Sequence, residues 1–284
     1  EKRLRDHLRQ YSSVAIALSG GVDSTLLTLM AQQELGHGAV HAITGVSSSL
    51  PGSSLELIRA FSKKSRVPLH LVDTDELNKL SYVRNSPDRC YHCKDELYDK
   101  ILAKAAELGT EVVLDGTHKD DLKGHRPGHR AALEWGIKSP FIELGIGKTT
   151  IRQLAHSQGL TNAAAPSSPC LSSRVAYGTP VTPERLKRIE RSENFLRSLG
   201  FPKIRVRLHG PTARIEVPPA DLGRLASQHH IIAKELLGGE CLKGISLHGE
   251  RKRGGKLIVL WNKLPTKSQP IFTSPCLRLP KFVR

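Results

Sequence analysis

Short apolar runs and apolar residues at helical spacing alternate along roughly the first 160 positions. SSVAIALSG at 12–20 predicts a buried strand, and STLLTLMAQQELG at 24–36 predicts a helix that ends at a glycine. The same alternation predicts a first helix over 1–10, strands over 39–48, 67–77 and 111–121, and helices over 54–65, 95–109 and 148–160. It favours a doubly wound α/β fold with a parallel sheet, whose ligand site lies at the carboxyl ends of the strands.

The pattern changes after PSSPCLSSRVAYG at 166–178, where proline, serine and glycine predict a loop and a domain boundary. A helix is expected over 182–200, with Thr182 as N-cap, then strands over 203–210 and 212–219, a helix over 221–238 and a strand over 243–249. These elements indicate a smaller α+β domain, with helices on one face of an antiparallel sheet. We therefore expect domains over 1–178 and 179–254, followed by a basic, proline-rich tail over 255–284 to which the pattern assigns no fold.

The composition and charge of the chain predict its compartment and limit its possible partners. The 284 residues are 38% hydrophobic and 25% charged, which fits a soluble globular protein, and no run approaches the roughly 18 apolar residues of a membrane helix. Because the charged first residues lack the apolar centre of a signal peptide, we expect a cytoplasmic protein without a membrane partner. The net charge of +16 is typical of proteins that bind nucleic acid, but residues 251–284 contain nine Lys or Arg and no Asp or Glu, so the tail holds much of that charge.

The segment SGGVDS lies between the first expected strand and the helix that follows it. Gly20 and Gly21 allow the backbone to approach a phosphate, Ser19 and Ser24 offer hydroxyls, and the start of the helix supplies unpaired N–H groups. The lysine of a GxxxxGK[ST] loop is missing, so transfer of a γ-phosphate is not expected. The segment resembles the signature of the PP-loop ATP pyrophosphatases, a Rossmann-like family. That resemblance implies use of ATP with release of pyrophosphate and a role for Asp23 in holding Mg²⁺. An ordinary glycine turn is the alternative.

Five cysteines form an odd set, which in a reducing compartment favours metal or catalytic roles over disulfides. Cys90 and Cys93 can hold one metal centre, and Cys170, in the loop after the nucleotide domain, can be a third ligand. Three thiolates would hold a [4Fe-4S] cluster with one iron left for substrate or sulfide. A zinc site that includes the intervening His92, a redox disulfide and unliganded thiols are the alternatives. The other two cysteines, Cys241 and Cys276, are expected to be incidental.

Five segments occur in order and at compatible spacing over roughly residues 5–250: SGGVDS, RCYHCKDELY, DGTHKDDLKGHRPG, PSSPCLSSRVAYG and SLGFPKIRVRLH. Together they resemble the LarE family of ATP-dependent sulfur transferases, which help to build the nickel-pincer nucleotide cofactor of lactate racemase. The resemblance implies adenylation of a carboxylate of pyridinium-3,5-biscarboxylic acid mononucleotide and its conversion to a thiocarboxylate. One version of the family sacrifices a cysteine at the position of Cys170. Another holds a [4Fe-4S] cluster on three cysteines, and the presence of Cys90, Cys93 and Cys170 implies this version.

The same resemblance assigns further residues. Arg205 and Arg207 match arginines for the substrate's phosphate, Ser173 matches their companion serine, and Glu193 matches a carboxylate near the site. In KIRVRL the two arginines fall on one face of a strand, from which they can grip a phosphate. Asp115 follows a strand at the sheet edge where nucleotide sits. The alternatives are a solvated strand face for the arginines, an acid on the helix surface for Glu193 and a solvated strand-end carboxylate for Asp115.

The resemblance also implies a homo-oligomer, a hexamer, whereas the sulfide donor is not identified by the sequence. Three other functions remain open. A PP-loop tRNA thiolase fits the net charge. Two features argue against a nucleic-acid partner: the tail holds much of that charge, and only 5% of the residues are aromatic and could stack on bases. A noncatalytic nucleotide-binding or metal-storage module is a second alternative. Amidation of an adenylated acid by ammonia, which requires no cysteine, is the third.

Overall fold

The computed structural model describes residues 1–122, 127–166, 169–210, 212–237, 244–250 and 256–262. The chain divides into two compact units. The first consists of Glu1–Cys170 and Pro180–Pro183, and the second of Leu171–Thr179 and the residues from Glu184 onward. The first change of unit therefore falls inside the proline- and serine-rich loop. The domain limits at 178 and 254 stay a prediction.

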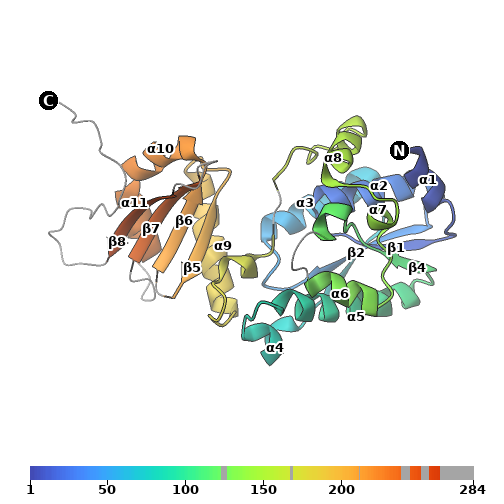
Figure 1. Ribbon diagram of the computed structural model, residues 1–284, viewed down its shortest axis with the longest axis horizontal. Coiled ribbons are helices and arrows are strands. Elements are labelled where there is room, and N and C mark those ends of the chain that lie inside the picture. Colours follow the sequence, from blue (N-terminus) through green and yellow to red (C-terminus); the bar gives the residue numbers. More distant parts are fainter. Residues whose placement is uncertain (123–126, 167–168, 211, 238–243, 251–255, 263–284) are drawn as a thin grey trace. The chain divides into compact units, whose positions relative to one another are not determined.

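Four parallel strands form the sheet of the first unit: β1 (Val14–Ala17), β2 (Val40–Val46), β3 (Leu69–Asp73) and β4 (Val112–Leu114), in the order β3-β2-β1-β4. All four residues of β1 are buried, because helices cover both faces of the sheet. Figure 1 shows these two helical layers. The predicted doubly wound α/β fold is confirmed.

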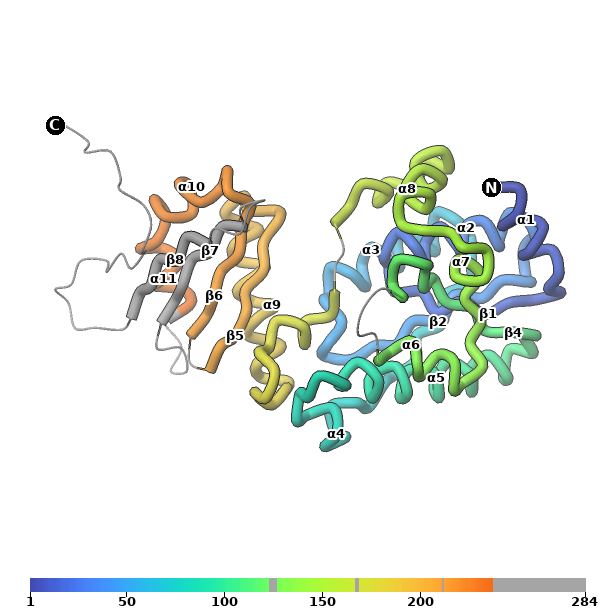
Figure 2. The backbone as a smooth tube through the Cα atoms, viewed as in Figure 1, coloured from blue at the N-terminus to red at the C-terminus, as the bar shows by residue number. Residues whose placement is uncertain are grey.

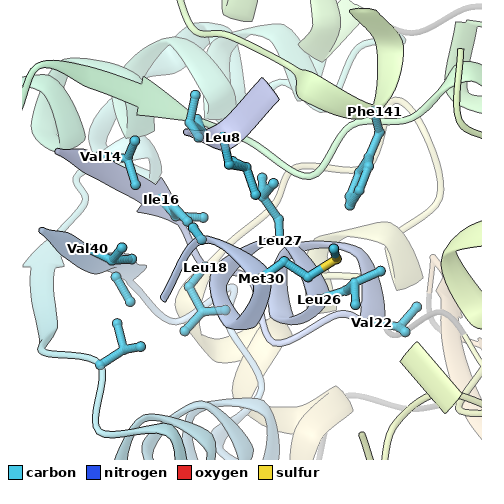
Figure 3. Close-up of a cluster of buried hydrophobic side chains, with 14 of the residues drawn as sticks. Leu8, Val14, Ile16, Leu18, Val22, Leu26, Leu27, Met30, Val40 and Phe141 are labelled. Carbon is cyan, nitrogen blue, oxygen red and sulfur yellow. The ribbon is translucent and has the colours of Figure 1, made fainter. Parts of the chain in front are cut away.

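One layer contains α1 (Lys2–Leu8), α2 (Val22–Leu35), α3 (Gly52–Ser65), α7 (Pro140–Glu143) and α8 (Lys148–Ser157), and the other contains α5 (Arg89–Glu107) and α6 (Pro127–Glu134), as the backbone trace of Figure 2 also shows. Successive side chains of β1 point to opposite faces of the sheet and pack into two different hydrophobic clusters. Val14 and Ile16 pack with α2 in the cluster of Figure 3, whereas Ala15 and Ala17 face Tyr98 and its neighbours on α5. Short elements complete this unit: η1 (Glu76–Asn78), α4 (Leu80–Val83) and η2 (Lys119–Leu122).

The helix predicted over 95–109 begins earlier, at Arg89, so that Cys90 and Cys93 lie in its first turn. The polar sequence RCYHCK carries no apolar period, so the pattern could not extend the helix backward. Three short helices, α4, α6 and α7, were not predicted either. At four to eight residues they are too short to show a helical period.

The second unit contains η3 (Leu171–Arg174), α9 (Pro183–Ser198), β5 (Arg205–His209), β6 (Thr212–Val217), η4 (Pro219–Asp221), α10 (Leu222–Ser227), α11 (His229–Leu237), β7 (Gly244–Glu250) and β8 (Lys256–Asn262). Its sheet has the order β5-β6-β7-β8. The prediction of an antiparallel sheet is wrong at one position, since β6 and β7 pair in parallel. The helical segment between them carries the chain back to the end where β6 began, as a parallel pair requires.

One further expectation changes. The helix predicted over 221–238 is two helices, which meet near Gln228. The limit at 254 leaves out β8, which pairs with β7. The rest of the predicted tail, Cys241 and Cys276 lie outside the described residues. Among the helices that the structure describes, none is long and apolar enough to cross a membrane.

Candidate active site

The SGGVDS segment forms a closed turn between β1 and α2. The Ser19 amide donates to the Ser24 hydroxyl at 3.2 Å, and the two hydroxyl oxygens are 3.1 Å apart. Gly20 has φ of +76°, and a Cβ there would lie 2.9 Å from Cγ1 of Ile58, so this position requires glycine. Gly21 caps the start of α2. The turn leaves the first N–H groups of a 14-residue helix available for an anion.

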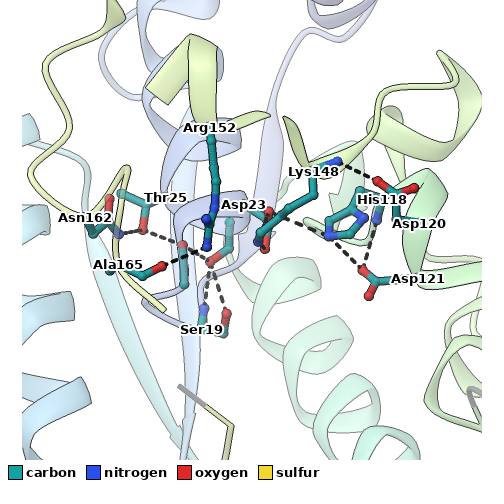
Figure 4. Close-up of polar contacts among 12 residues, drawn as sticks. Ser19, Asp23, Thr25, His118, Asp120, Asp121, Lys148, Arg152, Asn162 and Ala165 are labelled. Carbon is teal, nitrogen blue, oxygen red and sulfur yellow. Dashed lines mark hydrogen bonds and ion pairs between the residues drawn. The ribbon is translucent and has the colours of Figure 1, made fainter. Parts of the chain in front are cut away.

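Asp23, in the first turn of α2, faces a lysine that the sequence analysis missed (Figure 4). Nζ of Lys148 lies 2.6 Å from each Asp23 carboxylate oxygen. Lys148 begins α8, and its own amide donates to Asp120 at 2.8 Å. Nε2 of His118 lies 3.9 Å from Oδ1 of Asp23. The carboxylate is therefore paired with the Lys148 ammonium beside the turn.

Gly116 is a second residue that sequence reasoning missed. It follows β4 and packs against the start of α2, because a Cβ at this position would lie 2.7 Å from the Ser24 amide nitrogen and 3.0 Å from the Asp23 carbonyl carbon. Backbone atoms cannot yield at such distances as a flexible side chain can. The DG pair in LDGTHKDD was the available signal, since a glycine directly after a strand often marks a close backbone approach.

Replacing Gly116 by alanine is expected to displace the turn and weaken ATP binding about tenfold or more, because the added methyl would push on the amide of Ser24. Equilibrium ATP titration tests this. Gly136→Ala is the matched control: this glycine also lies in the first unit, and nothing lies within 4 Å of the Cβ that alanine would add, although its φ of +67° costs some stability. Unchanged ATP affinity in Gly116→Ala would show that the contact does not shape the site.

Asp115 is buried, so the solvated strand-end alternative is wrong. Its carboxylate accepts hydrogen bonds from Tyr98 at 2.8 Å, from the Thr117 amide at 3.0 Å and hydroxyl at 2.6 Å, and from Ser139 at 2.7 Å. Burial opposes its charge, but the Lys94 ammonium and these hydrogen bonds lower the pKa of Asp115 below its usual value. The residue thus fixes the loop that contains Gly116.

Replacing Asp115 by asparagine should lower the free energy of unfolding by about 2–4 kcal/mol, since it removes a buried, hydrogen-bonded charge. The folded pKa lies below the unfolded value of about 3.9, so this charge stabilises the fold above that value and the gain is lost as pH falls through the folded pKa. Urea unfolding of both proteins between about pH 6 and about pH 3 should show the difference shrinking with acidity. A difference independent of pH would contradict the assignment.

A buried polar chain connects Asp115 to the cysteine helix. Lys94 donates to the Tyr98 hydroxyl at 3.1 Å, and that hydroxyl donates to Asp115. Burial raises the pKa of Tyr98 to about 12. Burial disfavours the Lys94 ammonium, but Tyr98 and Asp115 outweigh it and raise the pKa of Lys94. Helix α5 therefore joins the residue beside Cys93 to the loop that packs on the SGGVDS turn.

Cys90 and Cys93 are one turn apart at the start of α5, and no disulfide joins them. Burial raises the pKa of the Cys93 thiol, and the nearby charge of Cys170 raises it further. His92 faces Asp88, with its Nε2 3.5 Å from that carboxylate. Within the described ranges, no group of three or more His, Cys, Asp or Glu side chains is arranged to hold a metal ion. An iron–sulfur cluster binds each thiolate through a different iron, so its ligands stand farther apart than those of one ion.

Glu193 is buried in the second unit, so the surface-acid alternative is wrong. Its carboxylate accepts from Arg174 Nε at 3.0 Å, from Arg197 at 2.8 Å and from the Val206 amide at 3.1 Å. It thereby ties α9 to η3 and β5. Arg174, also buried, was missed by sequence reasoning although it ends the quoted PCLSSR segment.

Arg205 and Arg207 occupy the more exposed face of β5, between the buried Val206 and Leu208. Nε of Arg207 lies 2.9 Å from both carboxylate oxygens of Glu216, and one terminal nitrogen donates to the Ser173 carbonyl at 3.0 Å. The Ser173 hydroxyl accepts from Arg174 at 3.1 Å. Ser173 and Arg207 are therefore in contact, while the roles of Ser173, Arg205 and Arg207 stay a prediction.

A comparison with known proteins places the first unit among the PP-loop enzymes that use ATP, since residues 1–168 match the asparagine synthase family. The chain is also 36% identical over 216 residues to pyridinium-3,5-bisthiocarboxylic acid mononucleotide synthase of Lactiplantibacillus plantarum, covering 76% of this chain and 78% of that relative. The chain belongs to the family of this synthase, the LarE family, and is an ATP-dependent sulfurtransferase. The family predicted from the five segments is confirmed.

Two uncharacterised relatives have similar coverage. A protein of Synechocystis sp. is 43% identical over 221 residues, covering 78% of this chain and 82% of that relative. One from Methanocaldococcus jannaschii is 31% identical over 236 residues, covering 82% and 89%. All three similarities extend beyond the first unit, because a stretch of 216 residues or more cannot fit within residues 1–170.

Proposed function

We propose that the protein adenylates a carboxylate of pyridinium-3,5-biscarboxylic acid mononucleotide and converts it to a thiocarboxylate. The sulfur would be sulfide on a [4Fe-4S] cluster held by Cys90, Cys93 and Cys170. The observation that carries the proposal is the buried chain from Lys94 through Tyr98 to Asp115, which joins the cysteine turn of α5 to the nucleotide turn. The name of the Lactiplantibacillus plantarum relative supports the choice of product.

In the first step the N–H groups at the start of α2, with Ser19, Gly20, Gly21 and Ser24, bind the phosphates of ATP. Asp23 would hold Mg²⁺, which offsets the charge of the leaving pyrophosphate. Lys148 contacts the same carboxylate and can turn to a phosphate oxygen when the metal takes its place. A carboxylate oxygen of the substrate attacks the α-phosphorus, and pyrophosphate leaves. Asp115 would act indirectly, by holding the loop that contains Gly116 in position.

In the second step sulfide attacks the carbonyl carbon of the acyl adenylate, and AMP leaves. The cluster, when bound, would supply this sulfide from the iron that lacks a protein ligand. Two observations support a fit of the three cysteines to this group. Cys90 and Cys93 occupy one helical turn without a disulfide, and Cys170 lies close enough to influence the ionisation of Cys93. Lys94 adds a buried positive charge beside thiolates that would otherwise repel one another.

The phosphate of the substrate would bind to Arg205 and Arg207, with Ser173 beside them. Two guanidiniums on one strand face can contact a phosphate bidentately. Glu193 would act in the catalytic region by keeping Arg174 and the Ser173 loop in position.

We also propose a cytoplasmic homo-oligomer, a hexamer, without a nucleic-acid partner.

Release of pyrophosphate tests the proposed substrate. The protein with ATP and Mg²⁺ should release pyrophosphate only when pyridinium-3,5-biscarboxylic acid mononucleotide is added, since a carboxylate of this compound accepts the adenylate. Nicotinic acid mononucleotide and total tRNA are the comparison substrates. Release that depends on tRNA instead of the biscarboxylic acid would contradict the proposal.

A further inference from the structure

Three arginines and one carboxylate lie on the more exposed face of the β5–β6 hairpin, and two of the arginines contact the carboxylate. In the antiparallel register Arg205 lies opposite Glu216, and Arg207 lies opposite Arg214. Nε of Arg207 is 2.9 Å from both oxygens of Glu216, and a terminal nitrogen of Arg214 is 2.9 Å from one of them. Burial opposes the charge of Glu216, but Arg207 and Arg214 lower its pKa below the usual value. The carboxylate is therefore ionised at neutral pH.

The charge on this face is not balanced. Arg207 and Arg214 share the single carboxylate of Glu216, which leaves one positive charge among these three groups, and like charges opposite each other across two strands destabilise a sheet. The positive field reaches His209 at the end of the same strand, where burial and then Arg214 and Arg207 lower the pKa. A phosphate bound beside Arg207 and Arg214 would offset this positive charge.

Arg214 also has an unused donor. In the part of the chain that the structure describes, its Nε is buried from solvent and has no hydrogen-bond partner. A buried N–H without an acceptor costs about 1–3 kcal/mol, so such groups usually serve a ligand or a water. Arg207, by contrast, uses its Nε on Glu216 and a terminal nitrogen on the Ser173 carbonyl.

We propose that Arg214 is a third ligand for the substrate's phosphate, with its Nε–H donated to a phosphate oxygen, and that Glu216 is the positioning residue that orients Arg207 and Arg214 before substrate arrives. This inference rests on the proposed function and deepens it. Two arginines are implied by the family resemblance, whereas the third follows from the register of the hairpin and the unused donor. A site with three arginines would select a mononucleotide strongly over the corresponding nucleoside.

The test is equilibrium binding by calorimetry on the full chain. The two probes are pyridinium-3,5-biscarboxylic acid mononucleotide and the same compound without its phosphate. Wild type should bind the phosphorylated compound at least about tenfold more tightly. Arg214→Gln should weaken that binding by about 10- to 100-fold and leave the affinity for the nucleoside unchanged. Arg191→Gln is the control, since this arginine of α9 has a 77% exposed side chain in a surface ion pair.

Arg214→Lys keeps the charge and the pair with Glu216 but removes the Nε donor, so it tests the contact even if the glutamine variant unfolds. A loss of binding in Arg214→Lys, for the phosphorylated probe alone, is the expected result. Equal weakening of both probes would show that Arg214 only stabilises the hairpin, and would overturn this inference. Failure of the wild-type protein to discriminate between the probes would instead overturn the whole phosphate site of the proposed function.

Discussion

Replacement of Asp23 by asparagine is expected to lower substrate-dependent pyrophosphate release by about 10²- to 10³-fold, the effect of removing one ligand for developing charge. The carboxylate lies in the first turn of α2, next to the turn that would hold the phosphates, and both its oxygens contact Lys148. Asparagine has the same shape but cannot offset the charge of Mg²⁺ or of Lys148. Binding of ATP without Mg²⁺ should therefore persist or strengthen, because Lys148 is released to the phosphates.

The measurement combines pyrophosphate release with ATP titration in the presence and absence of Mg²⁺. Asp99→Asn is the matched control, since Asp99 has a half-exposed side chain on α5 and its charge pairs only with the neighbouring Lys100 among the described contacts. Retention of Mg²⁺-dependent turnover in Asp23→Asn would remove Asp23 from the metal site. A loss of both ATP binding and thermal stability would show a folding defect instead.

Replacement of Cys90 by serine should remove the cluster and sulfur transfer together, while pyrophosphate release continues. The cysteine stands at the start of α5 and is exposed, so its substitution disturbs no packed core. Two remaining thiolates cannot hold a cluster that also keeps an iron open for sulfide. Iron and sulfide content after anaerobic reconstitution, visible absorption and product formation are the measurements.

Cys241→Ser is the control for this variant, since Cys241 has no cysteine at metal-binding spacing in the sequence. It should keep full iron content and turnover. Full iron content in Cys90→Ser would remove that residue from the cluster. Loss of pyrophosphate release in the same variant would show that the substitution disturbs the nucleotide site through α5.

Much of the first unit could be predicted from sequence because its sheet is buried on both faces. In a continuous apolar run such as VAIA in β1, side chains on both faces of the strand are apolar, and they are all buried only when helices cover both faces of the sheet. The direction of β7 could not be predicted, because a strand with one exposed face alternates in the same way in a parallel or an antiparallel pair. The start of α5 was hidden for another reason, since its first turn contains polar residues and two cysteines.

The site was predictable where a motif is contiguous and not where distant segments meet. SGGVDS shows its glycines and hydroxyls in six residues, whereas Lys148 reaches Asp23 from 125 positions away. The burial of Glu193 was equally hidden, because ERSENF contains the charged neighbours of a surface helix. Two of its partners, Arg174 of η3 and the Val206 amide of β5, belong to other elements, so the helical period of α9 cannot indicate them.

The proposed enzyme inserts sulfur repeatedly without consuming its own cysteine. The direct test is mass spectrometry of protein and small molecules after anaerobic incubation of the cluster-reconstituted chain with ATP, Mg²⁺, sulfide and pyridinium-3,5-biscarboxylic acid mononucleotide. Thiocarboxylate in excess of enzyme, with Cys170 intact, is the expected result. Product limited by the amount of enzyme, with Cys170 converted to dehydroalanine, would contradict it and make the protein itself the sulfur donor.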